Sequence, residues 1–266
     1  MRVDYHIHVE RGPYEIDWLR RFWETAAGRG IGEIGVSEHC YRFKQAGHLL
    51  DTEWGRQRCT ENIEDYLRLI ERARSQGMPV KLGVEVDYLE AREEETARFL
   101  EKYPWDYVIG SVHWIGQWGF EYPGGEWEIR GVVRAYHDYF EVFKKAAQSG
   151  LFDILGHADL IKIHGYRPTG EITGLLGEVA EVVGRQGLCV EVSTGGLRKT
   201  VGEIYPSQSL LELFAKAGAG ITLSSDAHDP GDVGRDFDRS VAAAKAAGYR
   251  EIQTYTGRRR AGVPLT

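Results

Sequence analysis

Short runs of β-branched and other apolar residues alternate along the chain with segments whose apolar residues recur every three or four positions. The first pattern is typical of buried strands and the second of amphipathic helices. The runs predict seven strands, at residues 3–9, 33–37, 80–86, 107–113, 153–159, 188–193 and 221–225. Apolar stripes predict helices near 90–101 and 236–246, and five stronger ones that include Ile16, Ile63, Val132, Leu175 and Leu210.

Seven strand–helix units in a chain of 266 residues indicate a parallel α/β fold. A distorted (β/α)7 TIM-like barrel fits this pattern best, and a doubly wound open sheet is the alternative. Residues 251–255 predict either a short eighth strand or a surface tail. No Pro/Ser-rich linker or low-complexity tract interrupts the pattern, so we expect residues 1–266 to form one domain.

The charge balance narrows the class of protein. Lys plus Arg number 33 and Asp plus Glu 40, which gives a formal net charge of −7. This balance argues against a nucleic-acid or anionic-membrane binder, because such proteins carry basic patches. No apolar run approaches the ~18 residues of a transmembrane helix, and the N-terminus has no apolar segment typical of a signal peptide. With three scattered cysteines as well, we expect a cytoplasmic protein, and the oligomeric state stays open.

Histidines and acids gather where the predicted strands end. Six of the nine histidines lie at or just beyond these carboxyl ends. In a barrel the carboxyl ends of the strands form one rim, which is where active sites are built. We therefore expect these side chains to meet. The candidate residues are His6, His8, His39, Glu85, His113, His157, Asp226 and His228.

Imidazoles and carboxylates are the protein ligands of Zn, Fe and Mn. His6 and His8 point the same way, because alternate residues of a strand share a face. Many such groups would be poorly solvated together without cations, and two or three divalent ions would resolve this. Glu85, on a central strand, is the natural bridging carboxylate. Taken singly, an H-x-H pair is more often a packed pair, and Asp226 could be a helix cap. Their joint position favours a metal centre.

The order of these motifs resembles one family closely. H-x-H at the start is followed by E-H, G-V-E, G-S-V-H, G-H-x-D and S-D-A-H, from His6 to His228. This combination resembles the PHP (polymerase and histidinol phosphatase) family. Residues 103–113, 193–198 and 203–206 look most like its histidinol-phosphatase branch.

The resemblance implies a trinuclear site of Zn, Fe or Mn on a distorted barrel. It implies one ion bound by His6, His8, Glu85 and Asp226, a second by Glu85, His113 and His157, and a third by His39 and His228. Family members usually add a histidine to the third ion from the loop after strand 1. That loop has no histidine here, so Glu15 or Glu10 is expected to substitute, or the third ion is weak or absent.

The resemblance also implies hydrolysis of a small phosphate monoester by metal-activated hydroxide, with L-histidinol phosphate of histidine biosynthesis as the substrate. Arg198 and Lys162 are the expected phosphate-binding cations, since a guanidinium can offer two parallel donors to phosphate. Glu85 is expected to be essential for catalysis as the bridge. Asp226 or His228 is expected to help protonate the leaving alkoxide.

Three other functions stay open at this stage. The chain could hydrolyse a different small phosphate ester, act as an amidohydrolase-type metal hydrolase, or bind metal without catalysis. The aromatic and glycine-rich segment 114–127 follows His113. It is either a lid over the substrate or a loop that its tryptophans anchor to the barrel.

Overall fold

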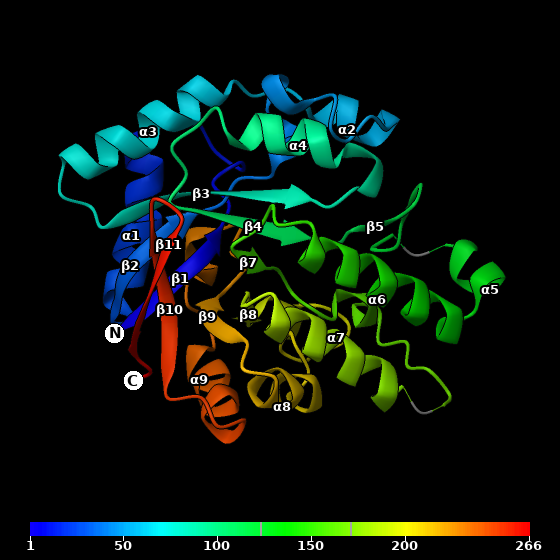
Figure 1. Ribbon diagram of the computed structural model, residues 1–266. Coiled ribbons are helices and arrows are strands. Elements are labelled where there is room, and N and C mark those ends of the chain that lie inside the picture. The colour runs from blue at the N-terminus through cyan, green and yellow to red at the C-terminus, as the bar shows by residue number, and fades with distance from the viewer. Residues whose placement is uncertain (123, 171) are drawn as a thin grey trace.

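The computed structural model describes residues 1–122, 124–170 and 172–266. Seven parallel strands form its main sheet in the order β1-β2-β3-β4-β7-β8-β9. An isolated bridge between Ile7 and Ala227 brings the first strand beside the last, so the sheet nearly closes into a barrel (Figure 1). The strands are β1 (Arg2–Ile7), β2 (Ile31–Val36), β3 (Val80–Asp87), β4 (Tyr107–Ser111), β7 (Ile154–Leu155), β8 (Cys189–Ser193) and β9 (Gly220–Ser224).

This strand order decides between the two predicted architectures. A doubly wound sheet reverses its strand order at a switch point, whereas here the spatial order follows the chain order throughout. The distorted seven-stranded barrel is therefore confirmed, and each of the seven predicted strands overlaps an observed one.

Helices surround the strands, as Figure 1 shows. All seven predicted helices are present within the described residues. None of the helices described is both long and apolar enough to cross a membrane. The α-helices are α1 (Ile16–Gly28), α2 (Glu53–Arg58), α3 (Ile63–Ser75), α4 (Glu93–Leu100), α5 (Glu126–Arg130), α6 (Val132–Gln148), α7 (Thr173–Arg185), α8 (Gln208–Lys216) and α9 (Phe237–Ala246). Short 3-10 turns connect them, at η1 (Cys40–Arg42), η2 (Lys44–Ala46), η3 (Glu90–Arg92), η4 (Leu160–Lys162), η5 (Gly195–Arg198) and η6 (Pro230–Asp232).

The segment at 251–255 is neither a barrel strand nor a surface tail. It forms β10 (Glu251–Thr256), which pairs antiparallel with β11 (Arg259–Pro264). The hairpin packs against the amino-terminal ends of the barrel strands. The backbone N–H of Tyr255 donates to the hydroxyl of Tyr5 at 3.3 Å, and that of Gly257 donates to Asp106 at 3.1 Å. The hairpin therefore covers the barrel end opposite to the candidate site.

Aromatic rings fill the barrel above this hairpin. The rings of Tyr5 and Tyr107 stack with their centroids 4.9 Å apart, and both residues are fully buried. Two glycines make room for Tyr107. A Cβ on Gly35 or Gly83 would lie 2.2 or 2.3 Å from its side chain, which is too close for any atom. With this end filled, a cavity can form only towards the carboxyl ends of the strands.

A buried carboxylate ties the first strand to the last. Asp4, in β1, accepts hydrogen bonds from the backbone N–H of Ser225 at 2.9 Å, from the Ser225 hydroxyl, and from the N–H of Gly234 at 2.9 Å. Burial raises the pKa of Asp4 to about 6, although these hydrogen bonds favour its charged form. The contact closes the barrel next to Asp226, a candidate metal ligand.

We expect Asp4→Asn to destabilise the protein by about 2–4 kcal/mol, because an amide NH₂ group would face donors that need an acceptor. Urea unfolding followed by circular dichroism measures this loss. Asp17→Asn, on the exposed face of α1, is the matched control and should change stability by less than about 0.5 kcal/mol. Equal stability of the two variants would show that Asp4 does not hold the barrel closed.

Candidate metal centre

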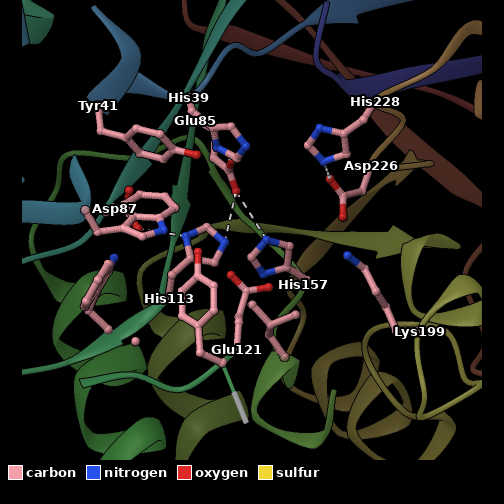
Figure 2. A pocket seen from close by; sticks show the side chains of 15 residues that line it. His39, Tyr41, Glu85, Asp87, His113, Glu121, His157, Lys199, Asp226 and His228 are labelled. Atoms are coloured by element: carbon pink, nitrogen blue, oxygen red, sulfur yellow. Dashed lines mark hydrogen bonds and ion pairs between the residues drawn. The ribbon is translucent and has the colours of Figure 1, made fainter. Parts of the chain in front are cut away.

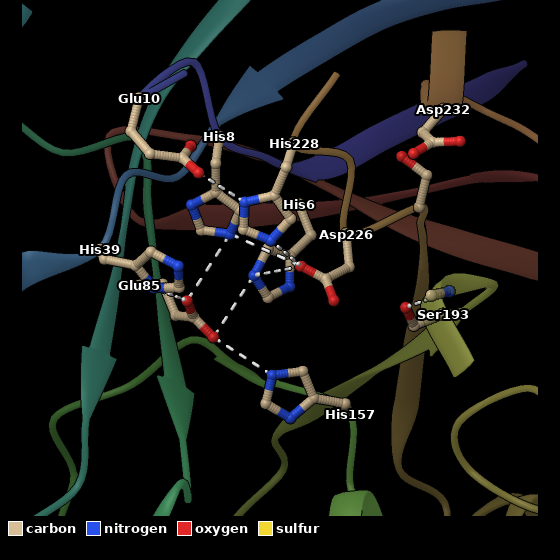
Figure 3. A network of polar contacts seen from close by, with 12 residues as sticks. His6, His8, Glu10, His39, Glu85, His157, Ser193, Asp226, His228 and Asp232 are labelled. Carbon is tan, nitrogen blue, oxygen red and sulfur yellow. Dashed lines mark hydrogen bonds and ion pairs between the residues drawn. The ribbon is translucent and has the colours of Figure 1, made fainter. Parts of the chain in front are cut away.

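The barrel brings all eight predicted histidine and carboxylate residues to one rim, seven of which Figure 3 labels and the eighth, His113, Figure 2. They come from six of the seven strands or from the residues that follow those strands, and each of the six contributes one or two side chains to a common centre. Within this cluster, the ligand atoms of His6, His8 and Glu85 lie within 4.8 Å of one another, as do those of Glu85, His113 and His157. A third such group is His8, His39 and His228.

Glu85 lies at the centre of the cluster. Its carboxylate oxygens are within 4.0 Å of five imidazoles, although the side chain is only 1% exposed. Burial would raise the pKa of Glu85, but the surrounding imidazoles hold it well below its usual range. An ionised, buried carboxylate needs positive charge around it. The five distances run from 2.6 Å for His39 and 3.2 Å for His157 to 3.3 Å for His6 and 3.7 Å for His8 and His113.

Several buried atoms in this cluster have no hydrogen-bond partner. They are Nε2 of His6, both ring nitrogens of His8 and Oε2 of Glu85. Leaving such polar atoms unpaired costs free energy, so native interiors rarely contain them without water or an ion. These atoms are metal-ligand types and face a common space. The donor set therefore fits divalent metal ions.

Three carboxylates orient the histidines from behind. Oε2 of Glu191 lies 2.8 Å from Nδ1 of His6, and Oδ1 of Asp87 lies 2.7 Å from Nδ1 of His113. Glu10 holds Nδ1 of His228 in the same way, at 2.8 Å. Each contact leaves Nε2 facing the cluster. Carboxylates in this position fix the tautomer of a ligating histidine and raise its basicity.

Two residues of the cluster have strained backbones. His157 and Asp226 have φ angles of 21° and 52°, in a region that residues other than glycine rarely adopt. Hydrogen bonds hold both in place. The N–H of His157 donates to Glu191 at 2.6 Å, and the carbonyl of Asp226 accepts from Arg198 at 3.0 Å. Strain of this kind is typical of functional sites.

Glu15 does not reach the cluster, which corrects one expectation. It is exposed and lies immediately before α1, where its backbone N–H donates to the carbonyl of Pro13 at 2.7 Å. Glu10 is the acid from this loop that meets the cluster, through His228. Glu10 lies shortly after the end of β1, close to the cluster. Glu15 lies immediately before α1, on the outside of the barrel.

The structure places the two expected phosphate-binding cations, Lys162 and Arg198, outside the lining of the cavity. Lys162 is buried, and its ammonium contacts Asp159 at 2.9 Å and the carbonyl of Ile204 at 2.8 Å. Arg198 directs Nη2 to the carbonyls of Ser225 and Asp226, at 2.6 and 3.0 Å. Both side chains are therefore engaged by the protein, and neither lines the cavity above the cluster.

A cavity of about 200 Å³ opens above the cluster (Figure 2). Among the described residues that line it, Lys199 is the one lysine or arginine, and its ammonium points into the cavity. The remaining wall is largely aromatic and acidic. It includes Tyr41, Trp54, Trp114, Glu121 and Tyr122.

The aromatic residues of the segment 114–127 have two different roles. Residue 123 of this segment lies outside the described part of the chain. Trp114 and Tyr122 line the cavity. Trp118 and Trp127 instead pack edge to face, with centroids 5.0 Å apart, and Trp127 donates to the carbonyl of Phe120 at 3.2 Å. These contacts hold the segment together internally, while part of the same segment faces the cavity.

Sequence reasoning missed several residues of this site. Asp87 had a usable signal, because it follows Glu85 by two positions and so shares its face of the strand. Glu191 had a similar signal, since it lies near the carboxyl end of the sixth barrel strand. Lys199 and Trp54 had none, because Lys199 follows the short turn η5 and Trp54 lies in the short helix α2, neither of which has a periodic apolar pattern.

Comparison with known proteins identifies the family. The family model described as "PHP domain" matches residues 4–195, which span more than half of the chain and include six of the eight clustered residues. This chain belongs to the PHP domain family. The resemblance of the sequence to the PHP family is thereby confirmed.

Relatives of this PHP domain carry consistent names. A probable histidinol-phosphatase of Deinococcus radiodurans is 33% identical, with 94% of this chain and 95% of that protein covered. A histidinol-phosphatase of Bacillus subtilis is 27% identical over 88% of this chain and 96% of that protein. The crystal structure of a histidinol phosphate phosphatase from Lactococcus lactis, complexed with zinc, L-histidinol and phosphate, shares the fold. Its TM-score is 0.79 at 22% identity, with 98% of both chains covered.

We expect metal binding to this PHP domain to release protons at pH 7. Burial opposes protonation of His113 and His228, but Asp87 raises the pKa of His113 to about 10, and Asp226 and Glu10 raise that of His228 to about 10. Both imidazoles therefore carry a proton in the metal-free protein at pH 7, and an ion must displace it. Metal affinity should fall as the pH falls.

Isothermal titration of zinc into metal-free protein, in buffers of different ionisation enthalpy, counts the released protons. We expect at least one proton per chain, and weaker binding at pH 6 than at pH 8. Binding with no proton release would contradict the ligand roles of these histidines.

Proposed function

We propose that this protein is a metal-dependent phosphatase that hydrolyses L-histidinol phosphate to L-histidinol and inorganic phosphate. The observation that carries this proposal is the cluster of histidines around Glu85 at the floor of a cavity that Lys199 also lines. Histidine and carboxylate ligands suit a site that must hold several cations, and a phosphate monoester needs positive charge. The names of the relatives support the choice of substrate.

We assign the metal ligands in three groups. The first contains His6, His8, Glu85 and Asp226, and the second contains His113 and His157 with Glu85 shared between the two. His39 and His228 would form the third group. The groups of ligand atoms within 4.8 Å support two or three divalent ions. Zinc is the favoured metal because the Lactococcus lactis structure contains it, and iron and manganese suit the same ligands.

The third group differs from the usual family pattern in one respect. Glu10 bonds Nδ1 of His228 at 2.8 Å and so occupies the outer side of that ring. We propose that Glu10 positions His228 rather than replacing the missing histidine as a direct ligand. The third ion would then depend on fewer protein ligands and bind more weakly than the other two.

Divalent ions in this site would lower the pKa of a bound water and offset the charge of the phosphoryl oxygens. The protein contributes the rest of the chemistry. Glu85 holds the two main ligand groups at a fixed separation, and the aromatic wall excludes water from one side of the cavity. Asp226, whose Oδ1 is 3.4 Å from Nε2 of His228, lies where its carboxyl group could pass a proton to the leaving alkoxide, and His228, as a metal ligand, would position it.

Lys199 replaces Arg198 and Lys162 in our assignment of the phosphate-binding cation. Its ammonium lies on the cavity wall near Asp226 and His157 (Figure 2). It forms no ion pair with a described residue, whereas Lys162 is held by Asp159 at 2.9 Å. Arg198 has a positioning role, because its guanidinium fixes the strained turn that contains Asp226.

A steady-state assay tests the function. Protein purified without chelators should contain at least two divalent ions per chain by elemental analysis. We expect kcat/KM for L-histidinol phosphate to exceed that for p-nitrophenyl phosphate by about 100-fold or more, because the aromatic and acidic wall contacts only the former's organic group. Removal of metal should abolish both activities, and zinc should restore them.

Glu85→Gln is the decisive variant in this assay. It should lose at least one ion and nearly all turnover, because an amide is a poor bridging ligand, while the circular dichroism spectrum stays unchanged. Slow and equal turnover of both esters by the wild type would instead favour a different small phosphate ester as the substrate. Metal binding without turnover of any ester would favour a non-catalytic metal protein.

We expect Lys199→Met to raise KM for phosphate esters about tenfold, because a charge-assisted contact to the phosphoryl group is lost. Lys199→Arg should retain most of the affinity. Lys216→Met, at the exposed end of α8, is the control and should match the wild type. Metal content should be the same in all four proteins. If inorganic phosphate inhibits Lys199→Met as strongly as the wild type, Lys199 is not a phosphate ligand.

A further inference from the structure

One carboxylate on the cavity wall has no assigned task. Glu121 lines the cavity, and Figure 2 shows its carboxylate pointing inwards, towards His113 and His157. The other acids that line the cavity are engaged. Asp87 contacts His113 at 2.7 Å, and Glu85 and Asp226 contact the imidazoles of the cluster. Glu121 forms no hydrogen bond or ion pair with any residue that the structure describes.

The backbone that presents Glu121 is firmly held. Phe120, its neighbour, is fully buried, and its carbonyl accepts hydrogen bonds from the indole of Trp127 and from Nε2 of His164, both at 3.2 Å. The ring of Phe120 also packs edge to face on Tyr139, with centroids 5.4 Å apart. A fixed backbone at this point sets the direction in which the Glu121 side chain leaves the main chain, towards the cavity, which favours a binding role over that of a surface acid on a mobile loop.

A lone carboxylate at this position opposes the binding of a plain phosphate ester. A phosphate monoester is an anion, and the cavity restricts its distance from Glu121, so the two negative charges repel each other. The repulsion becomes an attraction when the organic part of the substrate carries a positive charge. Glu121 therefore distinguishes substrates by the charge of the group attached to the phosphate.

The aromatic residues next to Glu121 suit the same organic group. Trp54 packs edge to face on Trp114 and on Tyr122, with centroids 5.8 and 6.2 Å apart. All three line the cavity. Aromatic faces attract cations and stack on flat rings, and they reduce the screening of a nearby charge by water. The wall thus offers an aromatic surface and an acid side by side.

We propose that Glu121 is a specificity residue whose carboxylate binds the ammonium group of the substrate's organic part. The enzyme would then select phosphate monoesters of amino alcohols over neutral esters of similar size. This inference rests on the proposed phosphatase function and extends it, because it assigns the selection of the substrate to a residue outside the metal cluster.

The test compares two substrates that differ by one group. They are L-histidinol phosphate and the phosphate ester of 3-(imidazol-4-yl)propan-1-ol, which lacks the amino group. Wild-type, Glu121→Gln and Glu128→Gln proteins are assayed after zinc loading, and their metal content is measured. Glu128 is an exposed acid of the same segment and serves as the matched control.

We expect the wild type and Glu128→Gln to prefer the amino-bearing ester. Glu121→Gln should lower kcat/KM for that ester by about tenfold or more, mainly through KM, and leave or raise the value for the deaminated ester. Its metal content should equal that of the wild type. An equal loss on both esters, no loss on either, or a loss of metal would overturn the specificity role while the phosphatase function stands. A zinc-loaded wild type that hydrolyses neither ester would overturn both.

Discussion

The site depends on one buried charge. Glu85 is almost completely shielded from water, and an ionised carboxylate can remain there only if positive charge surrounds it. In the metal-free protein, protonated imidazoles such as His6 and His113 supply this charge, and bound ions would supply it in their place. The cluster therefore has two electrically similar states that differ in whether protons or metal ions occupy it. Because Glu85 contacts five imidazoles from four different stretches of chain, the exchange involves several strands of the barrel and not a single one.

The contacts that close the barrel are also the contacts that shape the site. Asp4 binds the backbone of Ser225, and Arg198 binds the carbonyls of Ser225 and Asp226. The residue that follows the last strand is thus held from two sides, and the strained turn places the Asp226 carboxylate among the histidines. Glu191 has a comparable double role, since one oxygen faces His6 and the other accepts from the backbone of His157. Fold stability and ligand geometry share the same hydrogen bonds.

Most of the fold, and the floor of the site, could be predicted from the sequence. Apolar periodicity is a local signal that predicts each strand and helix. The carboxyl ends of the strands in a barrel meet at one rim whatever the conformation of the connecting loops. The residues of the cavity wall could not be predicted, because their positions depend on irregular turns and on contacts between residues that are distant in the sequence. Arg198 and Lys199 are neighbours at the end of the turn η5. The side chain of Arg198 donates to backbone carbonyls, whereas the side chain of Lys199 lines the cavity. The ammonium of Lys162 donates a hydrogen bond to the carbonyl of Ile204, which is 42 residues away in the sequence. The choice between Glu10 and Glu15 likewise rested on the path of an irregular loop.

The β10–β11 hairpin affects the order in which the parts of the barrel can pack during folding. Its residues cover Tyr5 and the strand ends near Asp106, which belong to the first half of the sequence. During synthesis these early strands leave the ribosome long before the hairpin does. The base of the barrel therefore stays uncovered until the hairpin has emerged from the exit tunnel. Until then, the nascent chain exposes Tyr5 and the aromatic ring stacked on it.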